Sequence, residues 1–223
     1  MHAKIISMDK GNTLEELKSE YARRKDTIEA QLGEFRKIRE SADDRKIFEE
    51  LAYCILTSAV GPRVGLRSLE AIRDILLEGT AEETESRLKG IHKYPEKAYY
   101  IVHTREYLKK EFGFDLRGLV DSFDDPGERR DFFALNKDIK GLGYTQASHF
   151  LRNIGFGGYA ILDKNVIKSL YDLGIIDSPK PPSTGKKYKE IENRMKSLAG
   201  ELGTGLDELD MLLWSLKTGR IPV

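Results

Sequence analysis

The sequence of 223 residues contains a single cysteine, Cys54, and therefore forms no internal disulfide. This fits a reducing compartment and excludes an iron–sulfur cluster held by four cysteines. The four histidines lack the spacing of a metal site, so no metal or other cofactor is expected. No apolar run approaches the ~20 residues that cross a bilayer, and the first ten residues lack the features of a secretory signal. We expect a soluble, cytoplasmic protein with no membrane partner.

An excess of charge of one sign is also missing, because 37 basic residues balance 37 acidic ones. A net charge of zero gives no support for a nucleic-acid partner, since domains that bind nucleic acids are commonly basic. A neutral chain still binds DNA if its basic groups gather on one face. Charged residues nevertheless make up 33% of the chain, a share typical of helices with a solvated outer face.

Helical periodicity dominates the chain, and no stretch alternates long enough for a convincing strand. We therefore predict an all-α fold of two helical subdomains with a cleft between them. Residues 1–60 and 174–223 are expected to form a terminal subdomain, and residues 61–173 the other. A proline-rich segment at 178–185 is the one clear linker.

The most informative segment is 139–150, in which Gly141 and Gly143 flank one aliphatic residue before an amphipathic helix. We predict a pair of helices within 139–154, joined by this short turn, with Leu142 between them. The amides of Gly143, Tyr144 and Thr145 would then point outward from a helix N-terminus, which is a seat for phosphate. Such contacts hold DNA without reading its sequence and need little net charge.

A bare Gly-x-Gly is more often a helix ended by a glycine cap and followed by another helix. The residues after this turn favour the first interpretation. The string GLGYTQASHFLRNI at 141–154, continued by AILDK at 160–164, resembles the helix-hairpin-helix DNA glycosylases. It is most similar to the compact archaeal and thermophilic 8-oxoguanine DNA glycosylase/lyase family. The resemblance extends to CILT at 54–57, GIHKYPEKA at 90–98 and the C-terminal segment around Trp214.

This resemblance implies that Asp163 is the catalytic carboxylate. By itself, an aspartate that ends an apolar segment and opens a helix is an N-cap. The two roles are compatible, because a helix N-terminus favours an ionised carboxylate. A fixed negative charge stabilises the oxocarbenium-like sugar that forms as a base leaves.

Members of the family that also cut the backbone carry a lysine directly after the Gly-x-Gly-aromatic turn. Thr145 occupies that position here, and it cannot form an imine. We therefore predict a monofunctional glycosylase that uses water as the nucleophile. The alternative is a bifunctional 8-oxoguanine glycosylase/lyase that uses another lysine, such as Lys140 or Lys164. Lys140, which precedes the turn, is expected to face solvent or phosphate.

A base that is flipped out of the duplex needs an aromatic or apolar sandwich and polar groups at its edges. Our candidates for this pocket are Trp214, His92, Tyr94 and His149. Core packing is the alternative for Trp214, and a buried structural histidine is the alternative for His149.

Two departures from the resembled family leave the lesion open. The family usually ends in a lysine, whereas this sequence ends in Ile221-Pro222-Val223. The family also has an asparagine where this chain has Ala59, in the region that contacts the orphaned base. The expected partner is duplex DNA that contains a damaged purine, bound by a monomer associated with the nucleoid.

Two alternatives belong to other functional classes. One is a non-catalytic DNA-binding protein, which the presence of Asp163 disfavours because a pure binder has no use for a carboxylate near phosphate. The other is a helical interaction module without a nucleic-acid partner, which only the zero net charge suggests.

Overall fold

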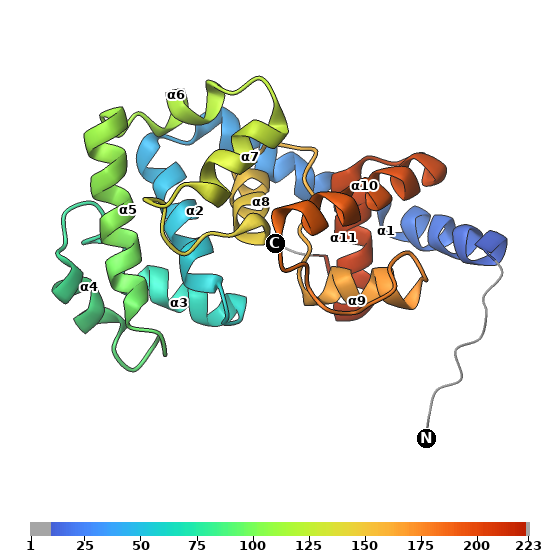
Figure 1. Ribbon diagram of the computed structural model, residues 1–223, viewed down its shortest axis with the longest axis horizontal. Helices are drawn as coiled ribbons and strands as arrows, with labels where there is room; N and C mark the ends of the chain where they lie inside the picture. Colours follow the sequence, from blue (N-terminus) through green and yellow to red (C-terminus); the bar gives the residue numbers. More distant parts are fainter. Residues whose placement is uncertain (1–9, 222–223) are drawn as a thin grey trace. The chain divides into compact units, whose positions relative to one another are not determined.

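The computed structural model describes residues 10–221, with side chains from residue 14 onward, and this range contains helices and no strand (Figure 1). The predicted all-α class is confirmed. Residues 1–9 and 222–223 lie outside this range. The last two residues of the C-terminal Ile221-Pro222-Val223, which the sequence analysis singled out, are among them. None of the described helices has the length and hydropathy needed to cross a membrane. The helices are α1 (Lys10–Ser41), α2 (Asp44–Thr57), α3 (Pro62–Ile72), α4 (Ala81–Leu88), α5 (Glu96–Phe112), α6 (Leu116–Asp121), α7 (Pro126–Leu135), α8 (Tyr144–Asn153), α9 (Lys164–Asp172), α10 (Gly185–Leu202) and α11 (Leu206–Thr218).

The chain divides into two compact units, and the boundaries differ from the predicted ones. Unit 1 combines residues 1–34 with residues 162–223, and unit 2 consists of residues 35–161. The glycine turn lies in unit 2. The boundaries move because α2 buries its apolar face in the core of unit 2, and α9 packs against α11 within unit 1.

The core of unit 2 is organised around α2. Its N-cap is Asp43, whose side chain accepts a hydrogen bond from the amide of Lys46. Phe48, Leu51 and Ile55 on this helix are completely buried. Burial of each such side chain contributes roughly 1.5–3 kcal/mol. Helix α2 contacts α3, α5, α6 and α8, so it links the glycine turn that precedes α8 to the rest of this unit.

Unit 1 is built on the contact between α9 and α11, with α10 against α11. Val166 and Leu170 of α9 and Leu209 of α11 are completely buried. The hydroxyl of Ser169 donates a 2.7 Å hydrogen bond to the Leu213 carbonyl and fixes the register of the two helices. This packing determines where the first residue of α9 lies relative to α11.

Candidate functional site

The glycine turn lies in unit 2 between α7 and α8, and it is longer than predicted. The sequence places a helix from residue 139 onward, whereas α7 ends at Leu135 and residues 136–143 form a connection without helix. The side chain of Asn136 accepts a 2.9 Å hydrogen bond from the amide of Asp138 and turns the chain away from the helix axis. The helices of this hairpin are therefore α7 and α8, which contact one another.

The two glycines of the turn serve different purposes. Gly141 has φ +78°, a conformation that favours glycine. A methyl group there would lie 2.9 Å from Cδ2 of Tyr100 and 3.3 Å from Cγ2 of Ile55, so the turn packs closely on α5 and α2. Gly143 has φ −111° and serves as the N-cap of α8, and a methyl group there would meet no atom within 4 Å. Leu142 between them is buried in the core, as predicted.

The residues around the turn are held by α5 and remain partly accessible. The amide of Lys140 donates a 2.9 Å hydrogen bond to the hydroxyl of Thr104, which is completely buried on α5. Lys140, Tyr144 and Thr145 are each partly buried. The first hydrogen bond of α8 runs from the amide of Ala147 to the Gly143 carbonyl at 2.9 Å. Helix α8 thus begins after an exposed glycine, Gly143. Because glycine has no side chain, no N-cap side chain covers the positive end of the helix dipole.

Asp163 lies in unit 1, where it is the N-cap of α9. Its Oδ1 accepts hydrogen bonds of 2.8 Å from the amides of Asn165 and Val166. Its Oδ2 accepts a 3.1 Å hydrogen bond from the indole Nε1 of Trp214 and a 3.3 Å hydrogen bond from the side-chain amide of Asn165. The carboxylate is partly exposed and is held by donors on both oxygens. The direction of the carboxylate is thus fixed, which suits a group that stabilises a developing cation.

Trp214 belongs to the same cluster through a contact that the sequence does not reveal. We expected its ring to line a base pocket, and the structure places its indole nitrogen on Asp163, 51 positions away in the chain. The ring is partly exposed, and the guanidinium of Arg220 lies 5.9 Å from its centroid. Asn165 is a member of this cluster that the sequence analysis missed. An asparagine two residues after an N-cap aspartate was the available signal.

His92 and Tyr94 lie in unit 2, in the loop that leads into α5. His92 is buried, and its Nε2 donates a 2.9 Å hydrogen bond to the Leu56 carbonyl while its Nδ1 accepts one from the Tyr94 amide at 3.2 Å. Nε2 thus ties this loop to the end of α2, and Nδ1 fixes the turn of the loop itself. Tyr94 is partly buried, and the ammonium of Lys93 lies 4.7 Å from its ring centroid.

His149 lies on α8, where its ring meets Tyr53 of α2 edge to face at a centroid distance of 6.1 Å. Burial, with a smaller contribution from the charge of Arg152, lowers the pKa of His149 from 6.5 to about 3. The imidazole is therefore neutral at physiological pH. Burial likewise raises the pKa of Tyr53 to about 12. By surface area the side chain of His149 is half-buried, between α8 and Tyr53 of α2.

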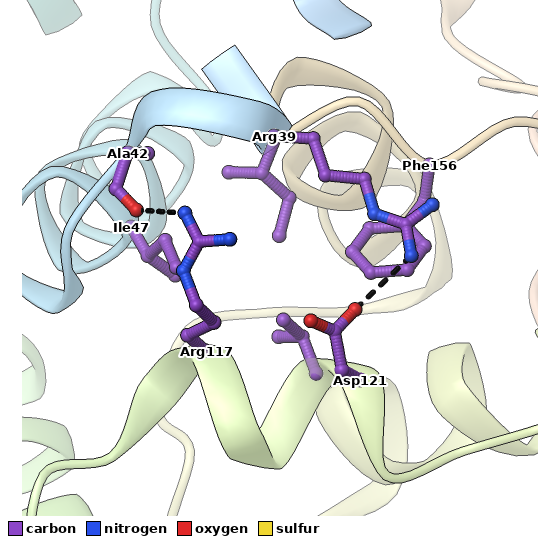
Figure 2. Close-up of a pocket in the computed structure, with 8 residues that line it drawn as sticks. Arg39, Ala42, Ile47, Arg117, Asp121 and Phe156 are labelled. Carbon is purple, nitrogen blue, oxygen red and sulfur yellow. Dashed lines mark hydrogen bonds and ion pairs between the residues drawn. The ribbon is translucent and has the colours of Figure 1, made fainter. Parts of the chain in front are cut away.

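A small pocket in unit 2 lies away from the glycine turn, between the end of α1, α6 and the segment after α8 (Figure 2). Arg39 forms a 3.1 Å ion pair with Asp121 across it, and Arg117 donates to the Ala42 carbonyl. The guanidinium of Arg39 lies 4.1 Å from the ring centroid of Phe156. The pocket has room for about one water molecule, so it is too small for a nucleobase.

The predicted residues thus separate into two groups. Asp163 and Trp214 form one hydrogen-bonded cluster in unit 1, and the other predicted residues lie in unit 2. Within unit 2 the turn residues and the pair of His92 and Tyr94 are separate features, both supported by α5 or its leading loop. The turn brings the start of α8 to the surface at Gly143, and the cluster in unit 1 holds an oriented carboxylate.

Comparison with known proteins identifies the family. Residues 28–204 match the model of a family described as 8-oxoguanine DNA glycosylase. An 8-oxoguanine DNA glycosylase/AP lyase of Methanocaldococcus jannaschii is 35% identical over 210 residues, which cover 93% of this chain and 96% of the relative. A protein of the same description from Fusobacterium nucleatum is 31% identical, over 96% of this chain and 99% of the relative.

The solved structures agree with the sequence comparison. The M. jannaschii 8-oxoguanine glycosylase/lyase, crystallised in complex with a 15mer DNA that contains 8-oxoguanine, superposes with a TM-score of 0.82. It is 34% identical, and the match covers 95% of this chain and 98% of that chain.

Proposed function

Because the chain belongs to the 8-oxoguanine DNA glycosylase family, we propose that it is a DNA repair glycosylase that flips a damaged purine out of duplex DNA and hydrolyses its N-glycosidic bond. Duplex DNA is the partner, and this substrate associates the protein with the nucleoid. The observation that carries the proposal is the carboxylate of Asp163, which two backbone amides and the Trp214 indole hold in place.

The proposed mechanism assigns a task to each feature. The amides at the start of α8, with Gly141, Gly143, Tyr144, Thr145 and Lys140 around them, grip the phosphates of the damaged strand. Trp214, Tyr94 and His149 are the aromatic candidates for contact with the extruded base. As the base leaves with the bonding electron pair, Asp163 stabilises the positive charge on the sugar. Water then attacks the anomeric carbon and loses a proton, which ends on the departed base, so that an abasic site and the free base remain.

We infer that the protein is monofunctional, since Thr145 cannot form an imine with the sugar. The second candidate function, glycosylase with lyase activity, is favoured by the description of the relatives as glycosylase/AP lyase. It requires another amine. Lys164 is exposed beside Asp163 in unit 1, and Lys140 is partly buried before the turn in unit 2.

The test is a panel of duplexes, each with one damaged purine, scored for base release with and without later alkali treatment. Strand cleavage that depends on alkali, with no adduct trapped by borohydride, supports hydrolysis by water. Thr145→Lys should create a trapped adduct, whereas the matched control Thr145→Arg adds charge without a nucleophilic amine. A strong adduct with the unaltered protein would overturn the monofunctional proposal. Binding to abasic duplex without release of any base would indicate a non-catalytic DNA-binding protein.

A further inference from the structure

The lysine at position 97 is unusual in this chain. Among the described residues it is the one lysine that is buried, with 6% of its surface exposed. It lies in the first turn of α5, where its amine donates a hydrogen bond to the hydroxyl of Ser58, at the end of α2. The amine also lies 5.3 Å from the ring centroid of Tyr100.

The charge of Lys97 is not neutralised within the protein. Across residues 10–221, no carboxylate oxygen lies within 4.0 Å of its nitrogen. Burial lowers the pKa of this ammonium, and the nearby charge of Glu96 offsets part of that shift. A buried charge without an oppositely charged partner destabilises a fold even when it is hydrogen-bonded, and an apolar side chain of similar size is commonly neutral or better there. The stability of the folded protein therefore does not explain why a lysine occupies position 97.

The position suggests that reason, because the ammonium lies against the glycine turn. A methyl group at Gly141 would lie 3.5 Å from Nζ of Lys97. The same turn leads into the N-terminus of α8, where Gly143 is exposed and caps no amide with a side chain. Two sources of positive potential, a buried ammonium and a helix N-terminus, are thus adjacent to one turn. An anion seated on the turn would compensate both.

We propose that the buried ammonium of Lys97 attracts the phosphate that the glycine turn binds. The backbone of the turn contacts the phosphate, and Lys97 lies on the inner side of that backbone and adds the positive charge. This inference rests on the proposed function, since the anion is the phosphodiester of bound duplex DNA. It also accounts for how a chain of zero net charge binds DNA, because one lysine acts where water screens it least. The Ser58 hydroxyl and the Tyr100 ring keep the ammonium at this place.

The experiment measures the affinity of the full-length protein for a duplex with an abasic-site analogue, and for an undamaged duplex, over a range of salt concentrations. With Lys97→Met, the slope of log affinity against log salt should become shallower by about 1, and affinity at 0.1 M salt should fall roughly tenfold on both duplexes. The melting temperature should stay equal or rise, because the substitution removes an uncompensated buried charge.

Lys110→Met is the matched control, because Lys110 lies at the other end of α5, is exposed and is ion-paired with Glu111. It should leave the salt slope unchanged. Lys97→Gln keeps a hydrogen-bond donor for Ser58 and covers the case in which the methionine variant does not fold. Lys97→Arg should retain the slope of the unaltered protein.

Salt slopes that are the same for Lys97→Gln and the unaltered protein would overturn the inference, as would a lower melting temperature together with an unchanged slope. Neither result touches the proposed function, which fails separately if the unaltered protein binds neither duplex.

Discussion

The glycine turn of unit 2 and the Asp163 cluster of unit 1 hold their functional groups by opposite means. The turn presents backbone amides, and its shape depends on one glycine that packs against Tyr100 and Ile55. The cluster presents one side chain, whose oxygens accept hydrogen bonds from two amides, an indole and a carboxamide. Grip on a repeating phosphate chain needs no particular side chain, whereas stabilisation of one developing charge needs a fixed one.

This contrast leads to different sensitivities. Side chains on the turn should be replaceable wherever the backbone conformation survives. In the carboxylate cluster, substitutions that change only the helix propensity at the start of α9 should be tolerated. Loss of the negative charge of Asp163 should not be. Four sets of substitutions test these expectations, in order of decreasing effect.

Asp163→Asn should reduce the single-turnover rate of base release roughly 100- to 1,000-fold, because the fixed negative charge near the sugar is lost. Asparagine is as good an N-cap as aspartate, but its NH2 group would face the Trp214 and Asn165 donors in place of Oδ2, so the melting temperature should fall moderately. Binding to abasic duplex should persist, since the turn in unit 2 is untouched. A variant with intact base release would remove Asp163 from the mechanism.

Gly141→Ala and Gly143→Ala test two different requirements of the turn. The first tests its backbone conformation, and the second tests how closely a phosphate approaches its backbone. Alanine at φ +78° costs about 1–2 kcal/mol, and its methyl group would press on Tyr100 at 2.9 Å, so the first variant should lose stability and DNA affinity together. The second should lose less melting temperature, because its φ is −111°, no atom lies near the added methyl group and only the poorer N-cap preference of alanine opposes the change. If phosphate approaches this backbone closely, DNA affinity should still fall. Equal melting temperatures for the two variants would contradict the division of roles between the glycines.

Trp214→Phe should lower the rate of base release roughly tenfold, since it removes the hydrogen bond to Oδ2 of Asp163 and keeps an aromatic ring. Affinity for abasic duplex should stay unchanged. Trp214→Leu removes both the donor and the ring, and it serves as the comparison. If the phenylalanine variant keeps the full rate, Trp214 acts through its ring rather than through its indole nitrogen.

The pKa of about 3 for His149 predicts a loss of stability in acid. The unfolded chain binds a proton near pH 6.5 and the folded chain does not, so the stabilisation present above pH 6.5 is lost as the pH falls toward 3. His149→Gln should flatten this dependence by up to about 1.4 kcal/mol per pH unit, measured by urea unfolding between pH 4 and 7. Hydrogen exchange should show that α8 loses protection in acid before α9 does. An unchanged acid dependence in the glutamine variant would show that other groups cause it.

Local signals in the sequence were sufficient for some features and insufficient for others. The start of α8 after Gly143 and the N-cap at Asp163 follow from residue type and position alone, and the structure has both. The helix predicted from residue 139 onward is absent, because residues 136–143 form a connection in which the Asn136 side chain accepts a hydrogen bond from the Asp138 amide.

Contacts between distant positions could not be predicted from one sequence. His92 is fixed by a carbonyl 36 positions earlier, and Trp214 meets a carboxylate 51 positions earlier. The division into units was misplaced for the same reason, since the burial of α2 depends on its tertiary neighbours. The buried ammonium of Lys97 likewise depends on three elements that meet in space, α2, α5 and the glycine turn.

The split composition of unit 1 has a consequence for how the protein is made. Its two segments, residues 1–34 and 162–223, flank the whole of unit 2 in the chain. During synthesis the ribosome completes the sequence of residues 35–161 while the partner segment of the N-terminal helix does not yet exist. Unit 2, with the glycine turn, is therefore able to mature early, and unit 1, with Asp163, is completed only when α9, α10 and α11 have been made.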